Sequence, residues 1–221
     1  MAQPARVSKA APFNIAYESE HCIVRELEPA DACETICGWM ADPAIAKALN
    51  APVRALSMDD LRKYIAQHDR VDGHLLGVFN RATGELIGLW SVYVDWEQSE
   101  FLVNVLIPGK IDGEYGALNE TGRPLYAIMF EDCGLETMRY NILASNHYMQ
   151  DRMSIPNSPR TVVPEHISEA RSASGEGRET IQHFRMNREQ YLKARSQRAE
   201  RDAAWLVARK ARREAENPSS T

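Results

Sequence analysis

The 221-residue sequence lacks a long hydrophobic run, and this absence sets the first bound on what the chain does. No stretch approaches the roughly 20 consecutive apolar residues that a transmembrane helix needs. No apolar run follows Met1 either, so we expect no signal peptide. We therefore predict a cytoplasmic protein without a membrane anchor.

Cysteine is also scarce, with four residues in the whole chain. Cys33 and Cys37 are four positions apart, a spacing that places both on one face of a helix. A structural zinc site would need a second pair of ligands at a suitable spacing, and the sequence offers none. We therefore predict ordinary reduced thiols and no metal site.

A strong excess of one charge is the third absence. The formal net charge is −5, with 26% charged and 44% hydrophobic residues, which is typical of a globular protein. Such a chain has no global positive field to recruit nucleic acid, so we do not expect a nucleic-acid partner. The charge is uneven, because over 185–216 basic residues outnumber acidic ones by roughly two to one.

Hydrophobic periodicity and turn residues predict one domain over 13–195, flanked by disordered tails at 1–12 and 217–221. Strands are expected over 13–27, 74–80, 85–96, 100–107, 135–144 and 179–186. Helices are expected from 31, 43 and 57, over 119–133, and over 188–216, where 196–216 forms a charged extension. The segment 154–179 is rich in Ser, Pro, Gly and Arg, which predicts an irregular, mobile insertion.

The junction after the strand at 100–107 carries the first chemical signal. The strand ends in a glycine-bearing loop, and a helix follows. Free backbone N–H groups and the positive end of the helix dipole together form a binding site for a phosphate or diphosphate. Gly113 and Gly116 would allow the backbone to approach such a group closely.

Three short motifs flank this junction in a fixed order: IVRELEPAD at 23–31, GELIG at 84–88 and FEDCGL at 130–135. Their order and spacing resemble the GNAT family of acyl-CoA N-acyltransferases, especially the branch that includes the ribosomal-protein N-terminal acetyltransferases. The resemblance covers roughly 22–146. It implies an α+β fold, in which helices flank a mixed, mainly antiparallel central sheet and a long C-terminal helix follows.

The resemblance also implies an activity. The chain would transfer an acetyl group from acetyl-CoA, as co-substrate, to a primary amine of a small molecule or a protein N-terminus, by direct attack in a ternary complex. One alternative stays open: a non-catalytic protein of the same fold, acting as a CoA-binding sensor or as an interaction module through its basic C-terminal helix. The same helix leaves a homodimer open.

Site residues follow from the same resemblance. The cofactor is expected on the fourth strand, the loop and the next helix, at Val105, Leu106, Ile107, Gly113, Tyr115, Gly116, Ala117 and Asn119. Glu100 is the first choice for the general base, ahead of Asp95 and Glu97, because it begins the cofactor-facing strand. Asn146 falls where the family has an asparagine, and Tyr148 is a nearby proton donor for the departing thiolate.

Overall fold

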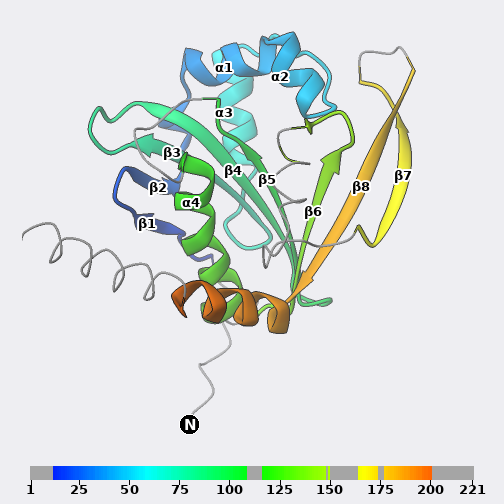
Figure 1. Cartoon of the computed structure of the whole chain (residues 1–221). Helices are drawn as coiled ribbons and strands as arrows, with labels where there is room; N and C mark the ends of the chain where they lie inside the picture. Colours follow the sequence, from blue (N-terminus) through cyan, green and yellow to red (C-terminus); the bar gives the residue numbers. More distant parts are fainter. Residues whose placement is uncertain (1–11, 109–115, 148, 150–163, 174–176, 201–221) are drawn as a thin grey trace, which may run out of the picture.

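The computed structural model describes residues 12–108, 116–147, 149, 164–173 and 177–200, and the observations below concern these residues. They form a mixed eight-stranded sheet in the order β1-β2-β3-β4-β5-β6-β8-β7 (Figure 1). The strands are β1 (Ala16–Glu18), β2 (Cys22–Glu26), β3 (Gly73–Asn80), β4 (Leu86–Asp95), β5 (Glu100–Leu106), β6 (Thr137–Leu143), β7 (His166–Arg171) and β8 (Arg178–Asn187). All neighbouring strands pair antiparallel except β5 and β6, which are parallel.

Helices cover both faces of this sheet. Between β2 and β3 the chain forms a 3₁₀ turn (Pro29–Asp31), α1 (Glu34–Ala41), α2 (Pro43–Ala48) and α3 (Met58–Ala66). Between β5 and β6 it forms α4 (Gly116–Ala127), which continues as a short π-helix (Ile128–Asp132). A last helix begins at 188 and reaches 200, the end of the described chain, so the predicted part beyond 200 lies outside the described residues. Within the described ranges, no helix is both long and apolar enough to span a membrane.

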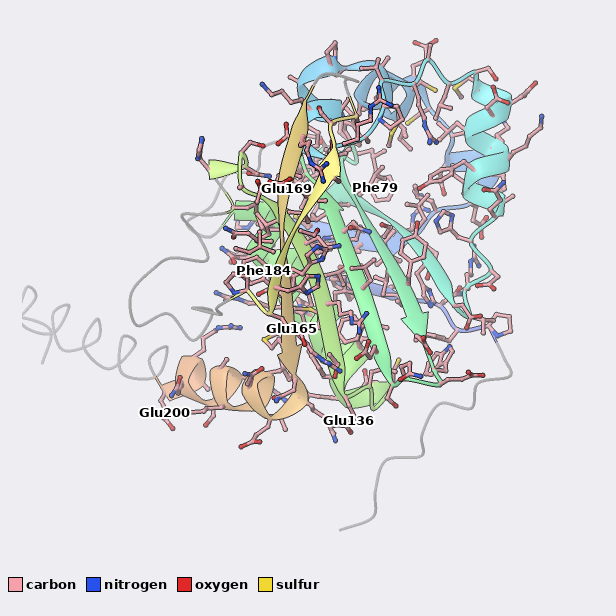
Figure 2. The ribbon with its side chains drawn as sticks, turned by 90° about the vertical axis from the view of Figure 1, so that its right-hand side faces the viewer. Phe79, Glu136, Glu165, Glu169, Phe184 and Glu200 are labelled. Atoms are coloured by element: carbon pink, nitrogen blue, oxygen red, sulfur yellow. The ribbon has the colours of Figure 1, made fainter. Side chains whose placement is uncertain are left out.

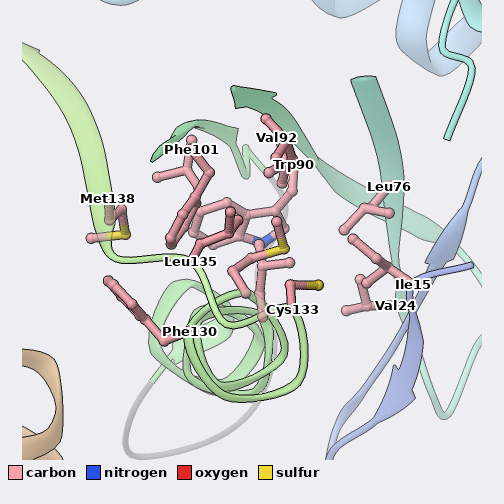
Figure 3. Close-up of a cluster of buried hydrophobic side chains, with 14 of the residues drawn as sticks. Ile15, Val24, Leu76, Trp90, Val92, Phe101, Phe130, Cys133, Leu135 and Met138 are labelled. Atoms are coloured by element: carbon pink, nitrogen blue, oxygen red, sulfur yellow. The ribbon is translucent and has the colours of Figure 1, made fainter. Parts of the chain in front are cut away.

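Two hydrophobic clusters explain this layering. The larger packs α4 and the π-helix against the central strands, and Figure 3 shows Trp90, Phe101 and Phe130 within it. The smaller packs Ile36 of α1 and Leu61 of α3 against the opposite face of the sheet. The expected α+β architecture, with helices on both sides of a mainly antiparallel sheet, is therefore confirmed.

The helix caps show why these segments end where they do. The Ser57 hydroxyl accepts a hydrogen bond from the backbone N–H of Asp60 at 3.1 Å, so Ser57 caps α3 as predicted. The Asp42 carboxylate accepts from the N–H of Ala44 at 2.7 Å and caps α2, whose first residue is Pro43.

Two predicted segments were wrong. The expected single strand over 13–27 is a hairpin, β1 and β2, whose turn is held by a 3.1 Å hydrogen bond from the Cys22 N–H to the Ser19 hydroxyl. The supposedly irregular segment 154–179 contains β7, which pairs with β8 at six positions. β7 lies at the sheet edge with mostly exposed side chains, so it needs few apolar residues; 154–163 and 174–176 lie outside the described residues.

The helix after β5 begins at Gly116, three residues earlier than the sequence predicts, and Pro124 lies inside it. A proline inside a helix removes one backbone N–H and crowds the preceding turn. The Tyr17 hydroxyl approaches this region and donates a 2.6 Å hydrogen bond to the carbonyl of Thr121. The hairpin β1–β2 is therefore joined to α4 within the turn that precedes the proline.

Candidate active site

The parallel pair β5 and β6 separates after three residues. Glu100–Leu102 of β5 pairs with Thr137–Arg139 of β6, and the pairing stops there although β5 continues to Leu106. The two strands diverge in Figure 1. Because no described strand pairs with this edge of β5 beyond Leu102, its remaining backbone groups face the opening rather than a neighbouring strand.

A cavity of about 350 Å³ occupies this opening, and we call it the strand cavity. Its walls come from β4, β5, β6, β8, α4 and the end of α2. They include Leu49, Trp90, Val103, Asn104, Val105, Leu118, Tyr126, Met138, Tyr140, Asn146 and Ile181. Most of these side chains are apolar, with a few amides and tyrosine hydroxyls among them. The strand cavity therefore suits an uncharged, flexible chain with a small number of polar groups.

The N-terminus of α4 lies beside the strand cavity, since Leu118 in its first turn lines the wall. Gly116 begins the helix with a φ of 64°, in the left-handed region that favours glycine. Among the described residues, no atom lies within 4 Å of where a Cβ on Gly116 would stand. The unpaired N–H groups of this first turn and the positive helix end can hold a phosphate group.

A buried hydrogen-bond chain fixes this end of α4 to the sheet. The indole Nε1–H of Trp90 donates to the Thr121 hydroxyl at 3.0 Å, and that hydroxyl donates to the Ala117 carbonyl at 2.7 Å. Gly122 allows the close fit, because a Cβ there would come within 3.3 Å of the Trp90 ring. Trp90 therefore forms part of the cavity wall and also holds the helix end in place.

A second cavity of about 530 Å³ lies on the opposite side of β5, and we call it the α3 cavity. Its walls come from α3, the segment before it, β3, β4 and β5, and include Arg54, Asp60, Lys63, Tyr64, Leu75, Leu89, Ser91, Asn104 and Leu106. The Asn104 amide donates a 3.3 Å hydrogen bond to the Ser91 hydroxyl across β4 and β5. Leu49, Asn104 and Val105 line both cavities, so the two meet at β5.

Glu100 lies at the paired end of β5 and lines neither cavity. Its carboxylate accepts a 2.7 Å bond from Arg139 Nε and a second bond from Arg185. Glu165, labelled in Figure 2, lies 3.8 Å from the same Arg185 guanidinium. The role of Glu100 as general base stays a prediction, and its position favours a clamp that joins β5, β6 and β8.

We expect Glu100→Gln to lower the free energy of unfolding by about 2 kcal/mol, because one charged acceptor is lost between two guanidinium groups. A clamp leaves kcat within about twofold, whereas loss of a general base lowers it by about 10²–10⁴. Urea unfolding and thiol release from acetyl-CoA measure the two effects. Glu169→Gln is the matched control, because its pair with Arg178 is exposed and should contribute little.

Only some of the other predicted site residues line the two cavities. Val105 lines both cavities and Leu106 lines the α3 cavity, while Ile107 packs against the core. Asn146 lines the strand cavity, and its side-chain oxygen accepts from the Met149 N–H at 3.2 Å.

On α4, the backbone carbonyl of Ala117 accepts a hydrogen bond from the Thr121 hydroxyl, and Asn119 lines neither cavity. Gly113, Tyr115 and Tyr148 lie outside the described residues. Each assigned role therefore stays a prediction.

Several cavity residues escape prediction from the sequence. Tyr126 is two helical turns from Leu118, so helix spacing could have placed both on the same wall of the strand cavity. Tyr140 lines the same cavity from β6 and stacks on Phe184 of β8, a contact that only strand pairing reveals. In the α3 cavity, burial raises the pKa of Tyr64 to about 12, so its hydroxyl stays a neutral donor at pH 7.

These features define an α+β protein whose sheet opens between two parallel strands beside a helix N-terminus. No protein-family model matches the sequence, and no curated protein matches it. Solved structures do match, beginning with a GNAT-family acetyltransferase from Bacillus anthracis, which is 12% identical with a TM-score of 0.62 over 79% of this chain and 99% of that one.

Two further structures have functional descriptions. A ribosomal-protein-S5-alanine acetyltransferase from Vibrio fischeri is 14% identical, with a TM-score of 0.63 over 79% of this chain and 97% of that one. A spermidine N-acetyltransferase from Vibrio cholerae, in complex with CoA and spermine, is 16% identical, with a TM-score of 0.60 over 78% and 98%. The chain therefore has the fold of the GNAT acetyltransferases, as the sequence motifs predicted.

Proposed function

We propose that the chain is an N-acetyltransferase that moves an acetyl group from acetyl-CoA to a primary amine. The observation that carries this proposal is the separation of β5 from β6 around a cavity beside the N-terminus of α4. A diphosphate fits the first turn of α4, and the mostly uncharged pantetheine arm fits the strand cavity and the unpaired edge of β5. We also infer that the protein works in the cytoplasm.

The reaction follows from this placement. The thioester would lie near Val105, where the two cavities meet, and the amine would arrive through the α3 cavity. The amine nitrogen attacks the carbonyl carbon, the C–N bond forms, the C–S bond breaks, and the thiolate takes up a proton while the amine loses one. A backbone N–H of β5 would stabilise the carbonyl oxyanion, and orientation of the two substrates supplies much of the rate.

Both acceptor classes remain open at this level. Among proteins with this fold, one of the solved structures is described as acting on the alanine of a ribosomal protein and another on spermidine. A protein N-terminus and a small amine are thus both acceptors that the fold accommodates. One observation favours the non-catalytic CoA-binding alternative: the Glu100 carboxylate is held by two arginines rather than left available as a base.

Calorimetry with acetyl-CoA, followed by thiol release over a panel of amines, tests the proposal. We expect saturable binding at micromolar concentrations and release of one thiol for each amide formed with at least one amine. Binding without release over the panel would support the sensor. Absence of binding would overturn both functions, because each depends on the CoA site.

A further inference from the structure

The α3 cavity has an unusual set of charges for an amine-binding site. Two cations and one anion line it: Arg54, Lys63 and Asp60. A site that selected only for the positive charge of an amine would have a negative net charge on its lining side chains. The lining of this cavity has a net positive charge. We propose that the acceptor is an amine that also bears an anionic oxygen group, a carboxylate or a phosphate, which Arg54 and Lys63 bind. This inference rests on the proposed acetyl transfer.

Arg54 is the principal anion-binding group. Its backbone N–H donates to the Met40 carbonyl at 2.9 Å, which fixes the segment between α2 and α3 against α1. Its guanidinium makes no hydrogen bond or ion pair with the part of the chain that the structure describes, although most described arginines do. An available guanidinium at a cavity wall is suited to bidentate binding of a carboxylate or a phosphate.

The guanidinium charge of Arg54 is also felt by Tyr64, which lines the same cavity. Burial raises the pKa of Tyr64 to about 12, and the nearby Arg54 partly offsets that rise. The phenol therefore stays protonated at pH 7, and its hydroxyl interacts with Tyr93. Arg54 thus supplies the charged donor on this wall, beside a neutral phenol.

Lys63 is available to a ligand because its partner is weakly held. Lys63 Nζ lies 4.0 Å from an Asp60 oxygen, and their side chains are 77% and 58% exposed, so this pair contributes little. The other Asp60 oxygen accepts a 2.6 Å bond from the Ser57 hydroxyl, and this bond lowers the pKa of Asp60. Asp60 is thus ionised and engaged by the helix cap, which leaves Lys63 free to face an anion.

The floor of the cavity gives the acceptor a direction. Ser91 and Asn104 are neutral and hydrogen-bonded to each other, and Asn104 lies where the α3 cavity meets the strand cavity. Arg54 comes instead from the segment before α3, and Lys63 comes from α3. An acceptor would place its anionic group against Arg54 and Lys63, with its amine toward β5. A polyamine would meet two cations and a single carboxylate, Asp60, which already accepts the Ser57 hydroxyl, and this balance disfavours it.

Matched pairs of amines test this selectivity by thiol release: an amino acid against its carboxamide, and glucosamine 6-phosphate against glucosamine, with spermidine as the polycation. We expect kcat/KM to be at least tenfold higher for the anionic member of one pair than for its neutral member. The pair that shows this difference identifies the anionic group of the acceptor as a carboxylate or a phosphate. Higher kcat/KM for the neutral members or for spermidine would overturn the inference.

Charge-removing variants locate the effect. Arg54→Gln should raise KM for the anionic amine at least fivefold, which reduces the preference for it, and should leave kcat within twofold. Lys63→Gln should have a smaller effect on KM. Arg62→Gln is the matched control, because Arg62 neighbours Lys63 on α3 but pairs with Asp59 at 2.7 Å and lines neither cavity. An equal loss in Arg62→Gln would mean that overall charge, rather than the α3 cavity, sets the preference.

Binding to CoA-saturated protein separates failure of this inference from failure of catalysis. If no amine releases thiol, calorimetry with the same pairs should still show tighter binding of the anionic member, lost in Arg54→Gln. That result would retain the anion site and reject the transferase. Thiol release with neutral amines preferred would retain the transferase and reject the anion site. Equal binding of both members of each pair would reject the anion site, whether or not thiol is released.

Discussion

Replacing Trp90 with alanine is expected to lower the free energy of unfolding by about 3–5 kcal/mol and to weaken CoA binding at least tenfold. Trp90 is 1% exposed, packs in the larger core and forms part of the wall of the strand cavity. Its loss would leave a void beneath α4 and remove the donor to Thr121. Urea unfolding and calorimetry with CoA measure the two losses.

Trp90→Phe separates packing from hydrogen bonding. This variant keeps an aromatic ring in the wall but loses the indole N–H, so we expect a cost of about 1–3 kcal/mol, because part of the ring volume is lost with the hydrogen bond. The Thr121 hydroxyl can still donate to the Ala117 carbonyl, so CoA affinity should stay within a few-fold of the wild-type value. Wild-type CoA affinity in Trp90→Ala would show that α4 is positioned without Trp90.

Local signals explain most of the fold that the sequence predicts. The strands β3, β4 and β5 alternate or run apolar over their whole length, and Ser57 caps its helix through a neighbour three residues away. Such features depend on residues close together in the chain, so the sequence alone suffices. The hairpin turn between β1 and β2 was missed because apolar residues continue on both sides of it.

The strand β7 shows where periodicity fails. It contains one large aliphatic residue, Ile167, whose side chain is 59% exposed. A strand paired on one side only, with little buried surface, has no apolar pattern to detect. Its register comes instead from backbone pairing with β8, which a single sequence does not encode locally.

The site was predictable only along the elements that form it. The resemblance predicted Val105 as a cofactor-binding residue and Asn146 as a site residue, and both line the strand cavity. It could not place Glu100, because the Arg185 that engages it is 85 residues away and comes close only through the pairing of β5, β6 and β8. The α3 cavity was missed for the same reason, since its walls come from segments that are distant in the sequence.

Gly88→Ala is the second change for which a large effect is expected. A Cβ at this position would lie 2.7 Å from the Leu106 carbonyl oxygen and 2.7 Å from Ile107 Cγ1. Because one of these atoms belongs to the backbone, the end of β5 must move away from β4. We expect a loss of about 2–3 kcal/mol in unfolding free energy, in the range of overpacking, and at least a tenfold loss of CoA affinity.

The loss of affinity follows from where that movement occurs. Leu106 and Ile107 directly follow Val105, which lines both cavities, so β5 would shift at the point where the thioester is proposed to lie. Gly38→Ala is the matched control, because Gly38 lies in α1 and no atom of the described chain lies within 4 Å of an added Cβ. Alanine should be neutral or slightly stabilising there. If Gly88→Ala loses stability but binds CoA as the wild type does, the end of β5 does not contribute to the CoA site, and the cofactor must be held by α4 and β6 alone.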